Sequence, residues 1–318
     1  MQIAMRLRSL AWPLLALLLF GAPGLAQAEP DSALYWALSR DGRPAGYLLG
    51  TIHSEDPRVL DFSEDFAEEL NANQVFAMEM VPDLPTLTRL TEYMHYQDGS
   101  TLEQRIGAER FARVRDALAG YRVPPAWIER MKVWAAMMTL SVPPPSTGLF
   151  MDFSLSLRAA GAGLKVVGLE TLEQQLSFLE RMPADQQLAL LDQALDEHAR
   201  VVEVHDRMIE NYLAGDLLSL AAQVDEQLAE LPPQARRYFM SEGIEERNRR
   251  MLATLLPLFG ESRVFVAVGA LHLPGEAGLI ALLRGQGFEL SPLPLPFSAA
   301  ERGGEPEQGG DHETADAP

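Results

Sequence analysis

The chain has 318 residues, of which 47% are apolar and 22% are charged, so its composition is that of a globular protein. Its 26 basic and 45 acidic residues give a net charge of −19, which excludes nucleic acid as an expected partner, because binding to phosphates needs a surplus of Lys and Arg. The absence of cysteine excludes disulfides, thiolate metal sites and thiol catalysis.

The first 28 residues have the features of a secretory signal peptide. Arg6 and Arg8 precede an apolar stretch of 13 residues from Leu10 to Ala22, and small residues at 26–28 form the pattern that a signal peptidase reads. The apolar stretch is shorter than the about 20 residues of a transmembrane helix, so a cleaved signal is favoured over an uncleaved anchor. We therefore expect residues 1–28 to be removed, leaving an exported, periplasmic chain without a stable membrane span.

Short apolar runs along the rest of the chain are typical of buried strands in a parallel sheet. Four of them lie at 46–50, 74–78, 165–168 and 263–268, and runs at 34–38 and 287–290 are expected to form a leading edge strand and a closing strand. Helical patterns follow most of these runs, at 63–72, 152–160, 171–181 and 275–285. This alternation predicts an α/β fold with a largely parallel or mixed central sheet and flanking helices.

Two longer stretches, at 84–140 and 183–259, have almost wholly helical patterns and are expected to be large helical insertions that cover the sheet. Together with the strands they predict one α/β domain over residues 29–297. Residues 298–318 contain no apolar residue other than Ala and are rich in Gly, Pro, Glu and Asp. Such a segment buries too little surface to offset its ordering entropy, so a disordered acidic tail is expected.

Histidine and glutamate residues stand at the ends of four predicted strands. Gly50-Thr-Ile-His53 and Gly269-Ala-Leu-His272 are both G-x-x-H motifs, and Glu79 and Glu170 follow the two strands between them. Open α/β sheets bind their ligands outside the carboxyl ends of the strands. The four side chains are therefore candidates for one functional site.

Imidazole and carboxylate groups suit a divalent transition metal such as Mn, Co, Zn or Fe. Without thiolates, a catalytic site of His and Glu ligands with an open water position is the natural form. The alternative is a structural role, in which each histidine caps the following helix and Glu79 is a buried ion-pair partner. The sequence contains no H-E-x-x-H, G-x-S-x-G or P-loop motif that would favour another enzyme class.

Five segments, in order, resemble the TraB/GumN family, which includes the TIKI metalloproteases and belongs to a wider set with erythromycin esterases and ChaN-like proteins. The segments are Gly46-Tyr-Leu-Leu-Gly-Thr-Ile-His53, Phe76-Ala-Met-Glu79, Gly168-Leu-Glu-Thr-Leu-Glu-Gln174, Glu246-Arg-Asn248 and Val268-Gly-Ala-Leu-His-Leu-Pro-Gly275. The resemblance runs from about residue 34 to 290. It implies a sheet-centred α/β fold whose active site combines the paired G-x-x-H motifs with a carboxylate.

Carried onto this chain, the resemblance makes His53, Glu79 and His272 the metal ligands, with Glu79 also a catalytic residue. It points to Glu170 as a further catalytic residue. Glu170 could be a metal ligand itself or could support a ligand, and both roles stay open. The family's proteases imply a divalent metal as cofactor and a peptide or protein as substrate.

Four polar residues beside these candidates have less specific interpretations. Arg247 and Asn248 lie in a charged run, which is usually a solvated helix face, but either could orient a ligand or stabilise an oxyanion. Thr171 is expected to cap the helix that follows it, and Asp152 is expected to be a helix N-cap rather than a metal ligand.

Two functions from different classes remain open at this point. The first is an exported metal-dependent hydrolase, foremost a peptidase, in which the metal activates water. The second is a non-catalytic protein that binds haem or metal or assists envelope polysaccharide production. Neither sets an expectation for the oligomeric state.

Overall fold

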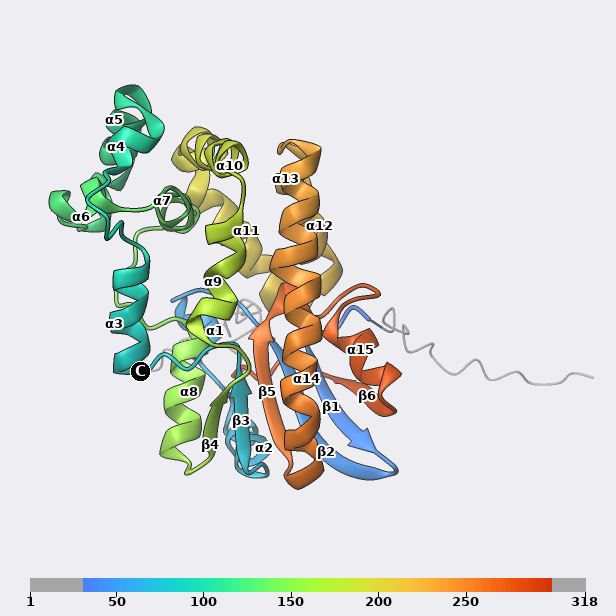
Figure 1. The fold of residues 1–318 in the computed structure, drawn as a ribbon. Coiled ribbons are helices and arrows are strands. Elements are labelled where there is room, and N and C mark those ends of the chain that lie inside the picture. The colour runs from blue at the N-terminus through green and yellow to red at the C-terminus, as the bar shows by residue number, and fades with distance from the viewer. Residues whose placement is uncertain (1–30, 299–318) are drawn as a thin grey trace, which may run out of the picture.

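The structure is a computed structural model that describes residues 31–298 (Figure 1). The predicted signal peptide at 1–28 and the predicted tail beyond Ser298 lie outside the described residues. Within residues 31–298, no helix has the length and apolar character needed to cross a membrane.

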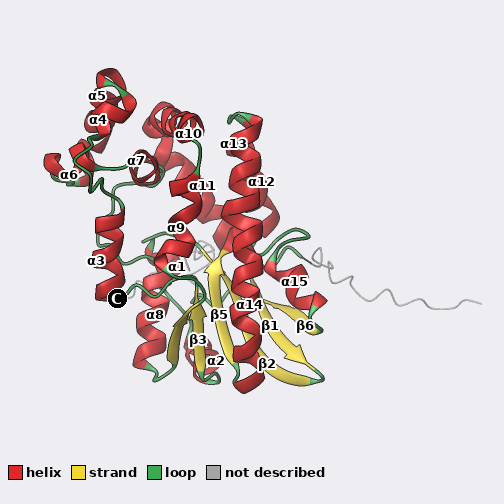
Figure 2. Ribbon diagram, viewed as in Figure 1, coloured by secondary structure: helices red, strands yellow, loops and turns green. Residues whose placement is uncertain are grey.

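One mixed sheet of six strands forms the centre of the fold (Figure 2). Its order is β4-β3-β5-β2-β1-β6, with β4, β3, β5 and β2 parallel and β1 antiparallel to both β2 and β6. The strands are β1 (Tyr35–Arg40), β2 (Arg43–Thr51), β3 (Val75–Met78), β4 (Lys165–Gly168), β5 (Val264–Gly269) and β6 (Phe288–Leu293). The predicted α/β fold is confirmed, and the four strands predicted as parallel share the sheet.

The placement of the first strand differs from the prediction. β1 is not an edge strand, because β6 returns from the end of the chain and pairs with it from Tyr35↔Leu293 to Arg40↔Phe288. The edges are β4 and β6. Pairing between the two ends of the chain leaves no local signal in the sequence, so the apolar run identified a strand without fixing its neighbours.

Close approach of β2 to β5 depends on Gly46. This residue has φ +140°, and a Cβ placed on it would lie 1.9 Å from the Val264 carbonyl oxygen. Glycine is therefore required there, and the resulting register pairs Thr51 with Gly269. The two G-x-x-H motifs consequently leave the sheet from neighbouring positions.

The helices form two groups. The first group packs on the sheet and comprises α1 (Pro57–Leu60), α2 (Glu64–Asn71), α8 (Met151–Gly161), α14 (Glu246–Glu261) and α15 (Leu279–Gly285). The helical pattern expected from residue 275 begins only at Leu279, because Gly275 has a positive φ and Gly278 lies against the carbonyls of Leu273 and Pro274.

The second group lies beyond the carboxyl end of β5, at the top of Figure 1, and has its own apolar core, which includes Leu140, Leu179 and Leu191. It comprises α4 (Leu102–Ile106), α5 (Ala108–Ala117), α6 (Pro125–Arg130), α7 (Val133–Leu140), α9 (Leu172–Arg181), α10 (Ala184–Glu197), α12 (Leu217–Ala229) and α13 (Pro233–Tyr238). Helices α3 (Leu84–Tyr93) and α11 (Val201–Leu213) connect this group to the sheet layer (Figure 1). The stretches 84–140 and 183–259 are thus largely helical, and the domain limits at 29 and 297 stay a prediction.

Candidate active site at the carboxyl edge of the sheet

Three parallel strands and one helix bring five of the candidate residues together. Glu79 follows β3 and Glu170 follows β4, and the Glu170 N–H donates to the Glu79 carbonyl at 2.9 Å, which extends the strand pairing by one step. Arg247 and Asn248 lie in the first turn of α14, and His272 ends a short 3₁₀ turn after β5. Glu170, Arg247, Asn248 and His272 are buried.

His272 is held in one orientation by Asn248. The Asn248 amide nitrogen donates to the Ala277 carbonyl at 2.8 Å, and since a carbonyl can only accept, Asn248 Oδ1 is the atom that faces His272. His272 Nδ1 therefore carries a proton and donates to that oxygen at 2.6 Å. Burial lowers the pKa of His272 to about 4, although the Glu79 carboxylate opposes this effect. The ring is neutral at pH 7, and Nε2 is left with a free lone pair.

Glu79 faces that lone pair. Its Oε1 lies 3.7 Å from His272 Nε2 and accepts the Gly269 N–H at 2.8 Å, while its Oε2 accepts from Arg247 at 2.5 Å and from Gln175 at 3.1 Å. Burial alone would raise the pKa of Glu79, but Arg247, the Gly269 N–H and His272, which is protonated at the low pH where Glu79 titrates, outweigh burial and lower the pKa to about 2. The carboxylate is therefore ionised.

The glycine of the second motif has a specific role at this point. A Cβ on Gly269 would lie 3.1 Å from Glu79 Oε1, closer than most real Cβ contacts. The absence of a side chain at Gly269 lets its N–H hold the carboxylate. This contact connects the second G-x-x-H motif to Glu79, although the two are far apart along the chain.

Arg247 joins the two carboxylates. Its Nε donates to Glu170 Oε2 at 2.8 Å, and its side chain and that of Glu170 are 8% and 0% exposed. Burial raises the pKa of Glu170 although Arg247 favours its ionised form, and Glu170 Oε1 has no hydrogen-bond partner among the described residues. The charged run around Arg247 is thus not a solvated face at this position, because the arginine is turned inward to two buried acids.

His53 lies apart from this cluster. Its side chain is 62% exposed, its Nδ1 lies 3.6 Å from Asp152 Oδ2, and its ring stacks on Phe150 with centroids 3.8 Å apart. Thr51 donates to the other oxygen of Asp152 at 2.5 Å. None of the contacts described for His53 includes Glu79 or His272, and among residues 31–298 no three His, Asp or Glu side chains are gathered closely enough to hold a metal ion. The three-ligand set stays a prediction.

The expectation that Asp152 is an N-cap is wrong. Phe150 occupies the N-cap position of α8 without a side-chain hydrogen bond, and Asp152 lies in the first turn with its carboxylate turned to Thr51 and His53. Thr171, in contrast, is confirmed as the N-cap of α9, in a capping box with Gln174. The neighbouring Gln175, which sequence reasoning missed, reaches Glu79 from one residue further along the same helix.

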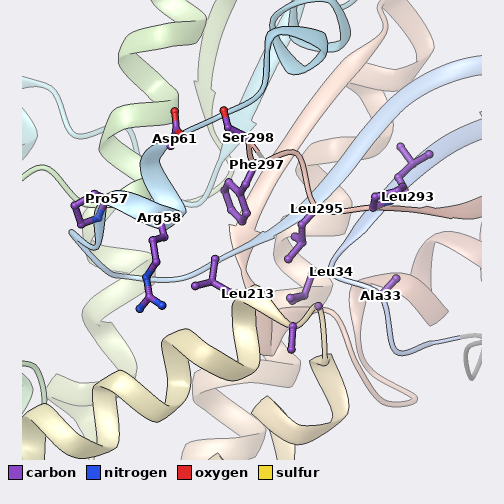
Figure 3. Close-up of a pocket in the computed structure, with 13 residues that line it drawn as sticks. Ala33, Leu34, Pro57, Arg58, Asp61, Leu213, Leu293, Leu295, Phe297 and Ser298 are labelled. Carbon is purple, nitrogen blue, oxygen red and sulfur yellow. The ribbon is translucent and has the colours of Figure 1, made fainter. Parts of the chain in front are cut away.

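One large pocket of the structure is separate from the cluster. Figure 3 shows this cavity of about 800 Å³, which is lined by residues such as Leu34, Leu213 and Phe297 and by Arg58. None of the candidate residues lines it. Asn248 instead lines a pocket of about 610 Å³ together with Leu271, and His53 lines one of about 440 Å³. The 800 Å³ pocket therefore does not coincide with the candidate residues, whose selection rests on the chemistry of their side chains.

Comparison with known proteins gives the family of the chain. The sequence model of the TraB/PrgY/gumN family matches residues 34–292. This chain belongs to that family. The match covers all six strands and both helical groups, so the family assignment applies to the sheet and to the helices beyond it.

Several relatives are similar at low identity. Metalloprotease TIKI1 of Homo sapiens is 27% identical over 334 residues, covering 86% of this chain and 66% of the relative. Metalloprotease TIKI2 of Xenopus tropicalis is 26% identical over 337 residues, covering 88% and 64%. The uncharacterized protein YbaP of Shigella flexneri is 25% identical over 251 residues, covering 76% and 89%. The chain spans slightly less than two thirds of the TIKI relatives, and no solved structure matches it.

Proposed function

We propose that this protein is an exported, periplasmic metal-dependent hydrolase, foremost a peptidase, with His53, Glu79 and His272 as its metal ligands. The observation that carries the proposal is the pair formed by His272 Nε2 and Glu79 Oε1. Both atoms are acceptors without a proton, and they face each other across 3.7 Å. Two such atoms repel each other in direct contact, and a cation between them would relieve this repulsion. The pair therefore supplies two ligand atoms of the kind that bind divalent metals.

The donor chemistry fits a transition metal. Neutral imidazole and carboxylate are the ligand types that such ions take in a site without thiolates. In metal sites a ligating histidine usually donates its other ring nitrogen to an oxygen, as His272 does to Asn248. His53 would be the third ligand through Nε2, since its Nδ1 faces Asp152. A divalent metal held there would lower the pKa of a bound water and polarise a substrate carbonyl.

The chain's own residues would prepare this chemistry. Asn248 fixes the tautomer of His272, and Arg247 holds Glu79 and Glu170 in place while balancing one of their two charges. Glu170 Oε1 is a buried carboxylate oxygen without a partner among the described residues, and it is our candidate to accept the proton released from the attacking water. Glu79 would then act as a metal ligand and would also orient the attacking water.

The test is the metal content of the purified protein together with its activity. Wild-type protein is expected to contain close to one equivalent of Mn, Fe, Co or Zn by mass spectrometry, and His272→Ala and Glu79→Gln are expected to lose it. Cleavage in a peptide library should be abolished by chelation and restored by added metal. Wild-type protein that stays metal-free after incubation with each of these ions would contradict the proposal.

A non-catalytic binding protein, for metal or haem or in support of envelope polysaccharide production, is the second candidate. The observation that favours it is the pKa of Glu79, about 2 and lowered in part by Arg247, which makes this carboxylate a weak base for activating water. Bound metal without cleavage of any peptide would select this function.

A further inference from the structure

The pocket beside His53 has features that neither the motifs nor the proposed metal site explain. It has a volume of about 440 Å³, within the range of about 300–1,000 Å³ that is usual for ligand pockets. One wall is the loop between α7 and α8, which includes Pro143, Pro144 and Pro145. A second wall is a face of α11, and His53 and Phe150 also line the pocket.

The proline wall is fixed by a carboxylate. Glu55 accepts the backbone N–H groups of Ser146, at 2.8 Å, of Thr147, at 3.0 Å, and of Gly148. Proline residues have restricted backbones, and these hydrogen bonds hold the end of the loop, so the wall is an apolar surface formed in advance of binding. Such a wall suits the aliphatic part of a long side chain.

The α11 wall supplies apolar and acidic groups on one helical face. Val202, Asp206 and Ile209 follow one another at spacings of four and three residues, which places them on the same side of the helix. His205 lies between them and places its Nε2 3.4 Å from the His53 carbonyl oxygen, so this face of α11 is close to the first motif.

The charge lining the pocket is entirely negative. Three carboxylates line it, those of Glu55, Asp56 and Asp206, and none of the described lining residues is Lys or Arg. Asp56 is paired with Arg58, and Glu55 is bound by the proline loop. Asp206 has no hydrogen bond or ion pair among residues 31–298 and is exposed to solvent. It is thus an available carboxylate in the lining of this pocket.

We propose that this pocket binds a lysine or arginine side chain of the peptide substrate, next to the bond that is cleaved. The stem of the side chain would lie on the proline wall and its cationic head would pair with Asp206. The net charge of −19 favours the approach of such a substrate. The inference rests on the proposed function, since it assigns the pocket to the substrate of the His53 site.

The test compares peptides that differ at one position. N-acetylated fluorogenic peptides carrying Arg, Lys, norleucine or Glu are incubated with the metal-loaded wild-type protein. We expect kcat/KM for the Arg and Lys peptides to exceed that for norleucine at least tenfold, with Glu the poorest. In Asp206→Asn, kcat/KM for the Arg and Lys peptides should fall to nearly the value for norleucine. The kcat/KM for norleucine should stay unchanged.

Glu203→Gln is the matched control, because Glu203 lies on the same helix but pairs with Arg200 and does not line the pocket. It should keep the preference of the wild type. Equal kcat/KM for Arg and norleucine in the wild type, or a loss in Asp206→Asn that is the same for both peptides, would overturn the proposal. A preference for free over acetylated peptide N-termini would also overturn it, since the cation would then be the terminal amine.

Failure of the proposed function can be separated from failure of this inference. If the metal-loaded protein cleaves no peptide, the affinities of the same peptides, measured by fluorescence anisotropy, still test the pocket. An Arg peptide that binds at least tenfold more tightly than its norleucine counterpart, with the difference lost in Asp206→Asn, supports the pocket without cleavage. Equal affinities contradict it.

Discussion

Both motif histidines turn the same ring nitrogen toward an oxygen from a helix. His272 Nδ1 donates to Asn248 on α14, and His53 Nδ1 lies beside Asp152 on α8, whose other oxygen is held by Thr51. In each case Nε2 is the nitrogen left for a ligand. A neutral amide supports the buried ring and a carboxylate supports the exposed one, which matches what each environment tolerates, since a buried unpaired charge is costly.

Asp152→Asn should therefore weaken the site without unfolding the protein. The amide keeps the volume and can still accept from Thr51, but it orients His53 less strongly. Loss of such a supporting partner costs about 10–100-fold in metal affinity or activity. We expect a fall of that size in kcat with little change in KM, and an unchanged melting temperature by circular dichroism. The exposed Asp116→Asn serves as control, and wild-type kcat in Asp152→Asn would contradict the supporting role.

Gly269→Ala should act on the site rather than on the core. The new methyl group would meet Glu79 Oε1 at 3.1 Å, so the carboxylate must shift by a few tenths of an ångström. We expect a clear loss of bound metal and activity with at most a small change in the free energy of unfolding. Gly260→Ala, in the last turn of α14 with open space around it, is the matched control and should be neutral or stabilising by up to about 1 kcal/mol. Equal metal binding in both variants would show that the Glu79 contact is dispensable.

At the level of strands and helices, the sequence predicted those features that local residue patterns determine, namely strands and helix caps. Each apolar run became a strand, and the Thr171 cap was recognised from its own neighbourhood. Contacts between distant segments were harder to predict. Arg247 sits in a run of charges that looks solvated, and only the packing of α14 against the strand ends shows that it is turned inward. The partnership of His53 with Asp152 has no local pattern at all.

The two apolar cores allow the predicted single domain to be tested. Leu191 on α10 is fully buried in the helical core, and Leu283 on α15 is fully buried in the sheet core. Replacement of either by Ala should cost about 2–5 kcal/mol. If the two cores unfold together, each variant shifts one common transition in urea. Two transitions, of which Leu191→Ala moves only one, would show two units instead.

At the scale of the whole molecule, the first 28 residues of the sequence predict export. The predicted signal peptide can be tested directly. Mass spectrometry of the protein recovered from the periplasm should find Glu29 as the first residue, because cleavage is expected after Ala28. Recovery of the exported protein with Met1 still attached would refute the cleavage prediction.

The position of β5 has a consequence for when the protein becomes active. β5 lies between β3 and β2, yet it comes late in the chain. Until residues 264–269 are available, the sheet exists only as the β1–β2 hairpin and the β3–β4 pair, which share no backbone hydrogen bonds. His272 follows β5 directly, so the same late segment joins the two halves and completes the site. If the chain is exported as we propose, it cannot assemble the candidate site before residues 264–272 have crossed, and folding waits on long-range pairing that is intrinsically slow.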